Sequence, residues 1–184
     1  MSKIYSIKNY QPRQEENFLF DANIWMYLFC PLGNYKPQII QNYSNFLKRI
    51  IIANSTIFLP SIIVSEFFNA YLRLEFNILK TMEPDAFVDF KRNYRGTERY
   101  KETIEYIARI VKNNILRMAI KINDEFASME MDALFRNISD HDYNDKFLIQ
   151  LAERNGWKIV TNDADFSYVQ NVEIFTSNPK MLRQ

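Results

Sequence analysis

The sequence predicts an α/β fold: a sandwich in which helices cover both faces of a mainly parallel central sheet of about four strands. Short apolar runs, rich in β-branched and aromatic residues, alternate with longer segments in which apolar residues recur every three or four positions. Two of the short runs are followed at once by acidic residues, and strand, acidic end and helix in that order are typical of an α/β crossover. The four runs lie at residues 17–21, 56–59, 157–160 and 172–175.

The first part of the chain sets this pattern. Residues 1–16 are mixed and polar and are expected to form an irregular arm or an edge strand. The run Asn17-Phe-Leu-Phe-Asp21 is the first predicted core strand, and a helix is expected over 22–29. After a turn rich in proline, apolar residues at helical spacing predict a second helix over 38–53.

The middle of the chain is predicted to be helical. Pro60-Ser61 suits the start of a helix that runs to about Lys80. A basic, helical insert is expected at about 75–135, within a single domain over 1–184, because 184 residues suffice for one buried core and hardly for two. Within the insert we expect a short helix before Gly96, a long helix to about Ile122 and another over 123–135.

The carboxyl-terminal part repeats the crossover pattern. Asp142 and Asp145 precede an apolar helical face, and Asn155-Gly156 closes the helix where a C-cap belongs. A short buried strand over 157–160 leads into Thr161-Asn-Asp-Ala-Asp165. Ligands of open α/β sheets bind outside the carboxyl ends of the strands, so a site is expected at this turn.

Composition excludes several classes of site. Cys30 is the only cysteine and His141 the only histidine, which excludes an intrachain disulfide, a zinc site of several thiolates and a histidine-rich metal site. A metal ion would have to be held by oxygen. A single cysteine fits a reducing, cytoplasmic location, and no apolar run is long enough to cross a membrane. We expect His141 to be a loop residue rather than a catalyst.

Charge is segregated along the chain. The formal net charge is +1, but residues 91–121 hold nine basic and three acidic residues (9 − 3 = +6), whereas residues 123–165 hold four basic and ten acidic ones (4 − 10 = −6). A basic arm beside an acidic site suits a metal-dependent enzyme that acts on a polyanion. Solvated helix faces explain the same numbers equally well.

Four acids occupy comparable places in the predicted fold: Asp21, Glu66, Asp145 and Asp163. Each lies at a strand end or on the helix that adjoins one, so a parallel sheet would bring them to one edge. An aspartate after a strand is often only a helix cap, but mid-helix Glu66 has no such explanation. Carboxylates that share a site repel one another, and Mg²⁺ or Mn²⁺, which prefer oxygen ligands, would relieve that repulsion.

These residues resemble a known family. The segments Phe18-Leu-Phe-Asp-Ala-Asn-Ile24, Pro60-Ser-Ile-Ile-Val-Ser-Glu66 and Ile159-Val-Thr-Asn-Asp-Ala-Asp-Phe166, with Asp145 followed by Ala152, look like the four acidic motifs of PIN-domain ribonucleases in the same order. The resemblance covers residues 17–72 and 139–175. Ala22 departs from it, because threonine or serine is common at that place.

The resemblance implies a metal-dependent endoribonuclease that hydrolyses RNA phosphodiester bonds. It implies that Asp21, Glu66, Asp145 and Asp163 bind one or two Mg²⁺ or Mn²⁺ ions. Asp165 would be an additional or secondary acid, and Asn23 and Thr161 would support the site. It further implies that the chain could be the toxin of a type II toxin–antitoxin pair, with an antitoxin protein as partner and a homodimer as oligomeric state.

Other hypotheses compete with this one. A non-catalytic PIN-like module could bind nucleic acid or protein through its basic insert, and a phosphatase could use Asp163 and Asp165, although little chain follows them to complete such a fold. The basic residues that could grip RNA phosphates are interleaved with Tyr94 and Tyr100, and they could equally be an ordinary exposed helix. They are Lys91, Arg92, Arg95, Arg99 and Lys101.

Overall fold

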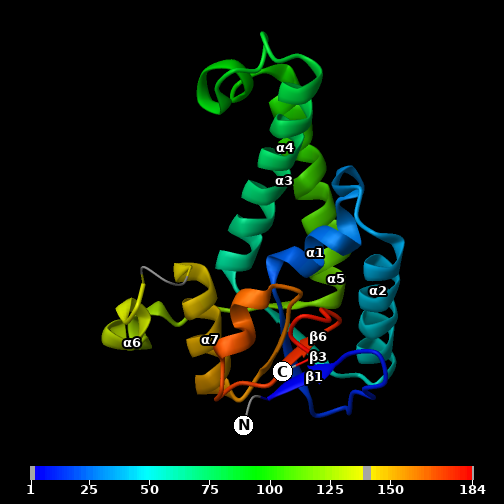
Figure 1. Cartoon of the computed structure of the whole chain (residues 1–184), viewed down its shortest axis with the longest axis vertical. Helices are drawn as coiled ribbons and strands as arrows, with labels where there is room; N and C mark the ends of the chain where they lie inside the picture. The colour runs from blue at the N-terminus through cyan, green and yellow to red at the C-terminus, as the bar shows by residue number, and fades with distance from the viewer. Residues whose placement is uncertain (1–2, 139–141, 184) are drawn as a thin grey trace.

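A six-stranded sheet forms the centre of the computed structural model, which describes residues 3–138 and 142–183 (Figure 1). Neighbouring strands pair in parallel, in the order β1-β6-β5-β2-β3-β4. The α/β prediction is confirmed, but the sheet is larger than the predicted four or so strands. The strands are β1 (Ile4–Ser6), β2 (Asn17–Phe20), β3 (Thr56–Leu59), β4 (Ile120–Lys121), β5 (Lys158–Val160) and β6 (Ile174–Thr176).

The two additional strands lie at the edges of the sheet. Strand β1 pairs with β6, so the edge-strand alternative for the first residues is the one the chain adopts. Strand β4 lies where a long helix was expected to run to Ile122, and that expectation is wrong. The helix ends because Ala119 is extended, and the Ile122 N–H then donates to the Leu59 carbonyl at 3.2 Å. Alternating isoleucines in this stretch favour a strand.

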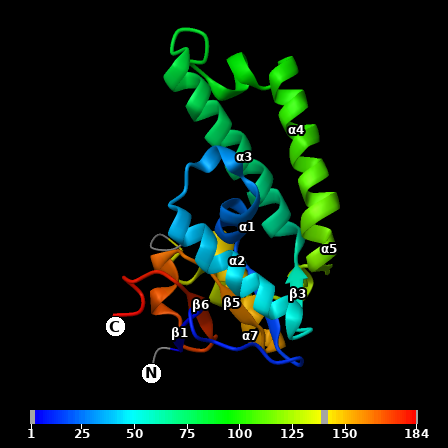
Figure 2. The same cartoon turned by 90° about the vertical axis from the view of Figure 1, so that its right-hand side faces the viewer.

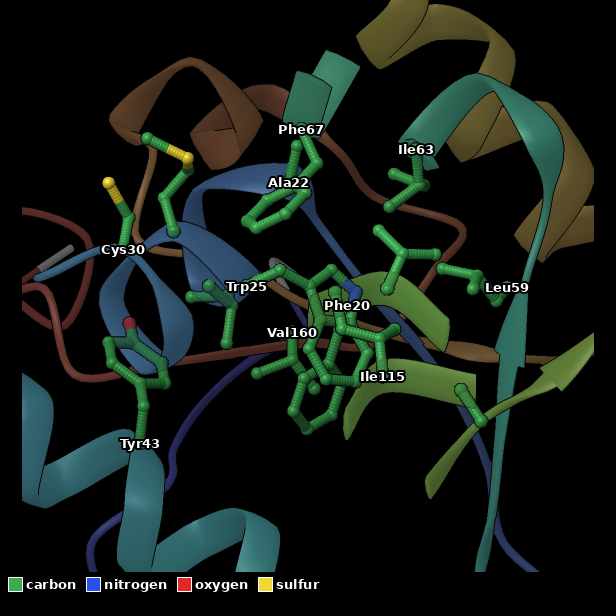
Figure 3. Close-up of a cluster of buried hydrophobic side chains, with 14 of the residues drawn as sticks. Phe20, Ala22, Trp25, Cys30, Tyr43, Leu59, Ile63, Phe67, Ile115 and Val160 are labelled. Atoms are coloured by element: carbon green, nitrogen blue, oxygen red, sulfur yellow. The ribbon is translucent and has the colours of Figure 1, made fainter. Parts of the chain in front are cut away.

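Helices cover both faces of the sheet. Alternate residues of β2 point to opposite sides: Phe18 and Phe20 lie in one apolar cluster and Leu19 in the other. Figure 3 shows the first cluster, where Trp25 packs on Phe20 with ring centroids 5.2 Å apart. The α-helices are α1 (Ala22–Phe29), α2 (Pro37–Ile52), α3 (Ser61–Met82), α4 (Glu98–Ile110), α5 (Leu116–Met118), α6 (Met131–Phe135) and α7 (Tyr143–Asn155).

Shorter helical segments connect these elements. The expected helix over 123–135 is largely absent, because Glu125 adopts a left-handed backbone (φ 54°) that interrupts it. Only a short 3₁₀ turn and α6 form there. The 3₁₀ segments are Pro31–Gly33, Phe126–Ser128 and Ala164–Tyr168, and the π-helical segments are Phe90–Tyr94 and Val111–Ile115.

Helices α3 and α4 project from the sheet as a long arm, residues 71–110 (Figures 1 and 2). The arm is closed by a buried polar contact: Glu75 of α3 is 3% exposed, accepts a hydrogen bond from the Tyr94 hydroxyl and forms an ion pair with Arg99 at 2.6 Å. Among the helices described, none combines the length and the apolar composition that a bilayer crossing needs.

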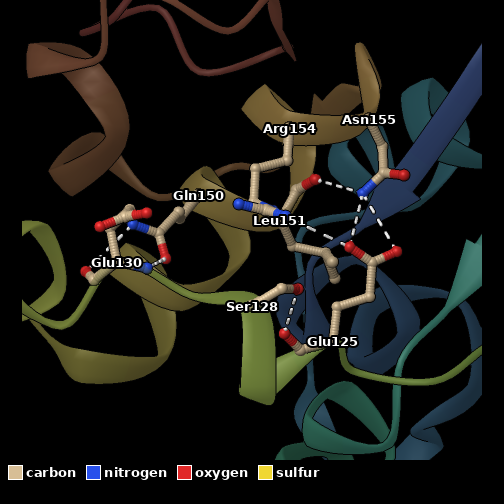
Figure 4. A network of polar contacts seen from close by, with 7 residues as sticks. All are labelled: Glu125, Ser128, Glu130, Gln150, Leu151, Arg154 and Asn155. Carbon is tan, nitrogen blue, oxygen red and sulfur yellow. Dashed lines mark hydrogen bonds and ion pairs between the residues drawn. The ribbon is translucent and has the colours of Figure 1, made fainter.

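A second polar network fixes helix α7 (Figure 4). The Glu130 N–H donates to the Gln150 side chain at 3.0 Å, and the Gln150 amide donates back to the Glu130 carbonyl at 3.2 Å. Asn155 donates to Glu125 and to the Leu151 carbonyl at the other end of the network. These bonds tie the segment before α6 to α7, the helix that carries Asp145.

Candidate active site

The four acids singled out in the sequence line one cavity of about 330 Å³. Asp21 follows β2, and Asp163 follows β5, its direct neighbour in the sheet. Glu66 lies in the second turn of α3, and Asp145 lies in the first turn of α7. Because the strands are parallel, their carboxyl ends lie at one edge of the sheet, and helices α3 and α7 begin at that same edge. Convergence of the acids is thus a property of the fold, whereas their roles as ligands stay a prediction.

Asp21 is held by the two residues that were expected to support it. The Thr161 hydroxyl donates to Asp21 Oδ2 at 2.6 Å, and the Asn23 amide donates to the same oxygen. Asn23 also contacts the Thr161 hydroxyl at 3.1 Å, so the three side chains form a closed set. Asp21 occupies the N-cap position of α1 but accepts no cap hydrogen bond. The interpretation of Asp21 as a mere helix cap therefore fails.

Asp163 has a different environment, on an exposed turn. Its N–H donates to the Thr161 hydroxyl at 3.0 Å, and its carboxylate accepts the Asp165 N–H at 3.0 Å, which caps the following 3₁₀ turn. Asp165 is exposed and lies outside the residues that line the cavity. Asp142 caps α7 by accepting a hydrogen bond from the Asn144 N–H, as expected. Asp145 takes no part in this cap and lines the cavity.

Sequence reasoning missed the residues that hold the acidic turn from behind. The Tyr43 hydroxyl contacts the Thr161 carbonyl at 3.1 Å and the Asn162 side chain at 2.9 Å, and it accepts the Ser177 N–H at 3.1 Å. Asn178 donates to the Asn162 carbonyl at 2.7 Å. Tyr43 lies within the predicted helix over 38–53, where it counts as one of the apolar residues at helical spacing. A hydroxyl on so apolar a face is the one signal that could have suggested this role.

Burial and mutual repulsion raise the pKa values of three of the acids. Burial, followed by the charge of Asp163, raises the pKa of Asp21 to about 6. Burial and the charge of Asp21 raise the pKa of Glu66 to about 7 and that of Asp145 to about 8. Near neutral pH, Asp145 and part of the Glu66 population therefore hold protons, because burial and the neighbouring acids disfavour their charged forms.

Glu66 has a buried carboxyl oxygen that no other described group of the protein pairs with. Its Oε2 atom is buried and has no hydrogen-bond partner, a condition that Trp25 Nε1 shares with it. Among residues 3–138 and 142–183, no lysine or arginine pairs with Asp21, Glu66, Asp145 or Asp163. Burying a carboxylate without a partner costs free energy, and a cation bound from outside the chain would compensate its charge.

The donor set fits a hard divalent cation. All the acids offer oxygen, which Mg²⁺ and Mn²⁺ prefer. Within the described part of the chain, no three acidic, histidine or cysteine side chains are drawn together closely enough to hold an ion. Mg²⁺ commonly binds through one or two carboxylates and keeps several waters, so it suits this looser arrangement better than a metal that needs a full protein shell.

The model of the PIN domain family matches residues 18–172. The chain belongs to the PIN domain family. The match spans both crossovers and all four acids, so the resemblance seen in the sequence motifs is confirmed.

A solved structure shares the fold of this chain. A chain of VapBC2 from Rickettsia felis, crystallised with a DNA fragment from the promoter, is 15% identical and has a TM-score of 0.51, covering 88% of this chain and 99% of that one. A chain of FitAcB from Neisseria gonorrhoeae is 14% identical with a TM-score of 0.48, covering 86% and 96%. No curated protein matches the sequence. At 15% identity, the likeness to the VapBC2 chain establishes the fold alone.

The five basic residues expected to bind nucleic acid lie on the arm of this PIN domain, and none of them lines the acidic cavity. Arg99 is engaged by buried Glu75, and Lys101 pairs with Glu98 at 3.2 Å. Their role in binding RNA stays a prediction, with Arg99 the least available for it. His141 lies outside the described residues.

Proposed function

We propose that this PIN-domain protein is a metal-dependent endoribonuclease. The observation that carries the proposal is the cavity in which Asp21, Glu66, Asp145 and Asp163 meet without a basic partner. Members of the family are typically nucleases, and phosphodiester hydrolysis is the chemistry that a hydrated divalent cation on carboxylates serves best. RNA as the substrate follows from the likeness of the motifs to PIN ribonucleases.

The chain's own residues would divide the work in this site. Asp21, Glu66, Asp145 and Asp163 would hold Mg²⁺ or Mn²⁺, which when bound polarises the phosphodiester and lowers the pKa of a water molecule. Asn23 and Thr161 fix the orientation of Asp21 through their shared hydrogen bonds. We do not place Asp165 on the ion, because it lies outside the cavity.

The acids must lose their protons to bind an ion, so metal affinity is expected to rise with pH. The steepest rise should fall between about pH 6 and pH 8, where the raised pKa values of Asp21, Glu66 and Asp145 lie. The apolar residues that line the cavity, Met26, Ala70 and Leu74, would exclude water from part of the bound substrate.

We also propose that the protein is the toxin of a toxin–antitoxin pair. VapBC2 carries the fold of this chain, and the partner we infer is an antitoxin that inserts a basic side chain into the acidic cavity, a charge-assisted contact that would neutralise the acids. We place the protein in the cytoplasm, where such a toxin meets RNA, with a homodimer as the proposed oligomeric state.

Cleavage of RNA tests the proposal. The wild-type protein should cut a fluorescently labelled RNA in Mn²⁺ or Mg²⁺ and not in EDTA, and Asp21→Asn should lose at least about 100-fold in rate. Asp165→Asn is the matched control, because it removes a neighbouring carboxylate that does not line the cavity. Full activity of Asp21→Asn, or equal activity in EDTA, would contradict the proposal.

The alternative is a non-catalytic binding module. Its one supporting observation is that, in the chain as described, no three candidate ligands stand close enough together to hold a metal ion. This alternative expects RNA binding that depends on the arm and is indifferent to Asp21→Asn, with no cleavage in any metal. The same two variants therefore separate the two functions.

A further inference from the structure

A second cavity, of about 530 Å³, adjoins the acidic one. Tyr27 and Tyr35 line both cavities, and their rings meet edge to face with centroids 4.7 Å apart. The far wall is formed by the base of the arm, where Tyr106 of α4 is 40% exposed. Tyr27 and Tyr35 therefore separate the second cavity from the acidic one.

The walls of this second cavity are uncharged. Aromatic and aliphatic side chains form most of the lining, and Asn34 and Asn114 add two amides. Neither amide makes a side-chain hydrogen bond to any residue in 3–138 or 142–183. Asn114 lies in the π-helical segment Val111–Ile115, and such segments are frequent at functional sites because they re-aim a side chain. The cavity thus offers ring faces together with free donors and acceptors.

A third cavity, of about 460 Å³, continues beyond Tyr106, which lines it as well. It contains Arg99 and Arg109 together with the acids Glu75 and Glu102. Glu75 already holds Arg99. Arg109 is the more available cation: it is exposed, lies 5.9 Å from the Tyr106 ring and reaches Glu105 only at 3.9 Å.

The geometry points to a base-binding subsite for single-stranded RNA in the second cavity, with Tyr106 as its principal stacking residue. This inference rests on the proposed function, because it names the substrate class of the same site. A strand whose phosphate lies at the acids would place a neighbouring base between Tyr35 and Tyr106. Its edge would face Asn34 and Asn114, and the next phosphate would approach Arg109.

The chemistry of the walls favours this occupant. A nucleobase has a ring face and a hydrogen-bonding edge but no charge, as the lining requires, and base stacking on aromatic rings is tolerant of sequence. Bases in a duplex are paired and cannot enter such a cavity, so only an unpaired strand fits. The subsite also differs from the basic residues at 91–101, which belong to the outer part of the arm.

Binding of a short fluorescein-labelled single-stranded RNA tests the subsite, measured by fluorescence anisotropy in Ca²⁺ with cleavage in Mn²⁺ followed in parallel. Tyr106→Leu should weaken binding about tenfold, and Tyr106→Phe should stay within about twofold of wild type because the ring is kept. Tyr5→Leu is the control: Tyr5 is 39% exposed on β1 and lines none of the three cavities. The same RNA annealed to its complement should bind more weakly than the single strand.

Unchanged affinity of Tyr106→Leu, or equal affinity for duplex and single strand, would overturn the inference even if the wild type cleaves RNA. Binding that depends on Tyr106 without any cleavage would support the subsite and contradict the proposed function instead. Light scattering of the free protein supplies the last outcome. A dimer that Tyr106→Leu dissociates would mean that a second copy fills the cavity, and would also overturn the inference.

Discussion

Helix α3 carries two glutamates in opposite circumstances, about two and a half turns apart. Glu75, in the arm, is buried and fully engaged by Arg99 and Tyr94. Glu66, beside the sheet edge, has a buried oxygen with no hydrogen-bond partner and faces other acids. Their local surroundings in the sequence are alike, since both are acids in apolar helical stretches, and only the motif that ends at Glu66 singled that residue out.

The difference teaches how to separate a structural carboxylate from a functional one. Glu75 is paired within the chain by Arg99 and Tyr94, so it needs no ligand to compensate its charge. Its ion pair with Arg99 joins α3 to α4. Glu66 is left unsatisfied at a cost that folding alone does not require. When one buried acid of a helix is paired and another is not, the unpaired acid is the candidate for binding a ligand.

The largest expected effect separates the two glutamates by activity. Glu66→Gln should reduce RNA cleavage by at least about 100-fold while leaving the thermal midpoint of unfolding equal or slightly higher, because it removes charge repulsion from the cavity. Circular dichroism and a cleavage assay on the same preparation check this. A variant that cuts RNA at the wild-type rate would break the comparison.

Arg99→Met should lower the stability of the protein, in contrast to Glu66→Gln. It leaves the Glu75 carboxylate buried without its cation, and we expect the free energy of unfolding to fall by about 2–3 kcal/mol, moderated because half of the Arg99 side chain reaches solvent. Urea denaturation measures the change. Arg95→Met removes an exposed arginine of the same arm and should stay near wild type; an equal loss in both variants would refute the buried pair.

The pH dependence of stability should sharpen the comparison further. The folded-state pKa values of Asp21, Glu66 and Asp145 lie above their ordinary ones, so between about pH 4 and pH 8 the folded protein binds more protons than the unfolded chain. Without metal, stability should therefore fall as pH rises through this window. Differential scanning calorimetry should show the midpoint falling by several degrees, and falling less in Glu66→Gln. A midpoint that rises with pH in EDTA would contradict these assignments.

The smallest expected effect concerns the support behind the acidic turn. Tyr43→Phe removes a hydroxyl that contacts Asn162 and accepts the Ser177 N–H, which should cost about 1–2 kcal/mol of stability. Urea denaturation measures this loss. Tyr5→Phe, on an exposed ring of β1 outside the acidic cavity, is the control. No difference between the two variants would remove Tyr43 from the account.

Much of this arrangement could be predicted from the sequence because it depends on local rules. The runs that became β2, β3, β5 and β6 are short and apolar between polar turns, and the acids follow from where those strands end. A parallel sheet then forces the carboxyl ends together. Asn23 and Thr161 were named because they lie in the same sequence motifs as Asp21 and Asp163, two residues from each. The Thr161 hydroxyl nevertheless donates to Asp21, 140 residues away in the sequence.

The missed features depend on contacts between distant parts of the chain. Strand β4 has only two residues and pairs with the free edge of β3, so its short local pattern was not enough to predict it. Glu75 and Arg99 meet through the pairing of two helices, a contact that no local sequence pattern shows. The Tyr43 hydroxyl reaches the acidic turn across more than a hundred residues of sequence.

The most direct test of a shared divalent cation is titration calorimetry with Mn²⁺, run at pH 8 in two buffers of different ionisation enthalpy. The wild type should bind Mn²⁺ with release of protons from the raised carboxyls, Asp21→Asn and Glu66→Gln should abolish or strongly weaken binding, and Glu105→Gln on the exposed arm should not change it. Absence of Mn²⁺ binding in the wild type, or equal binding in all four proteins, would contradict the account.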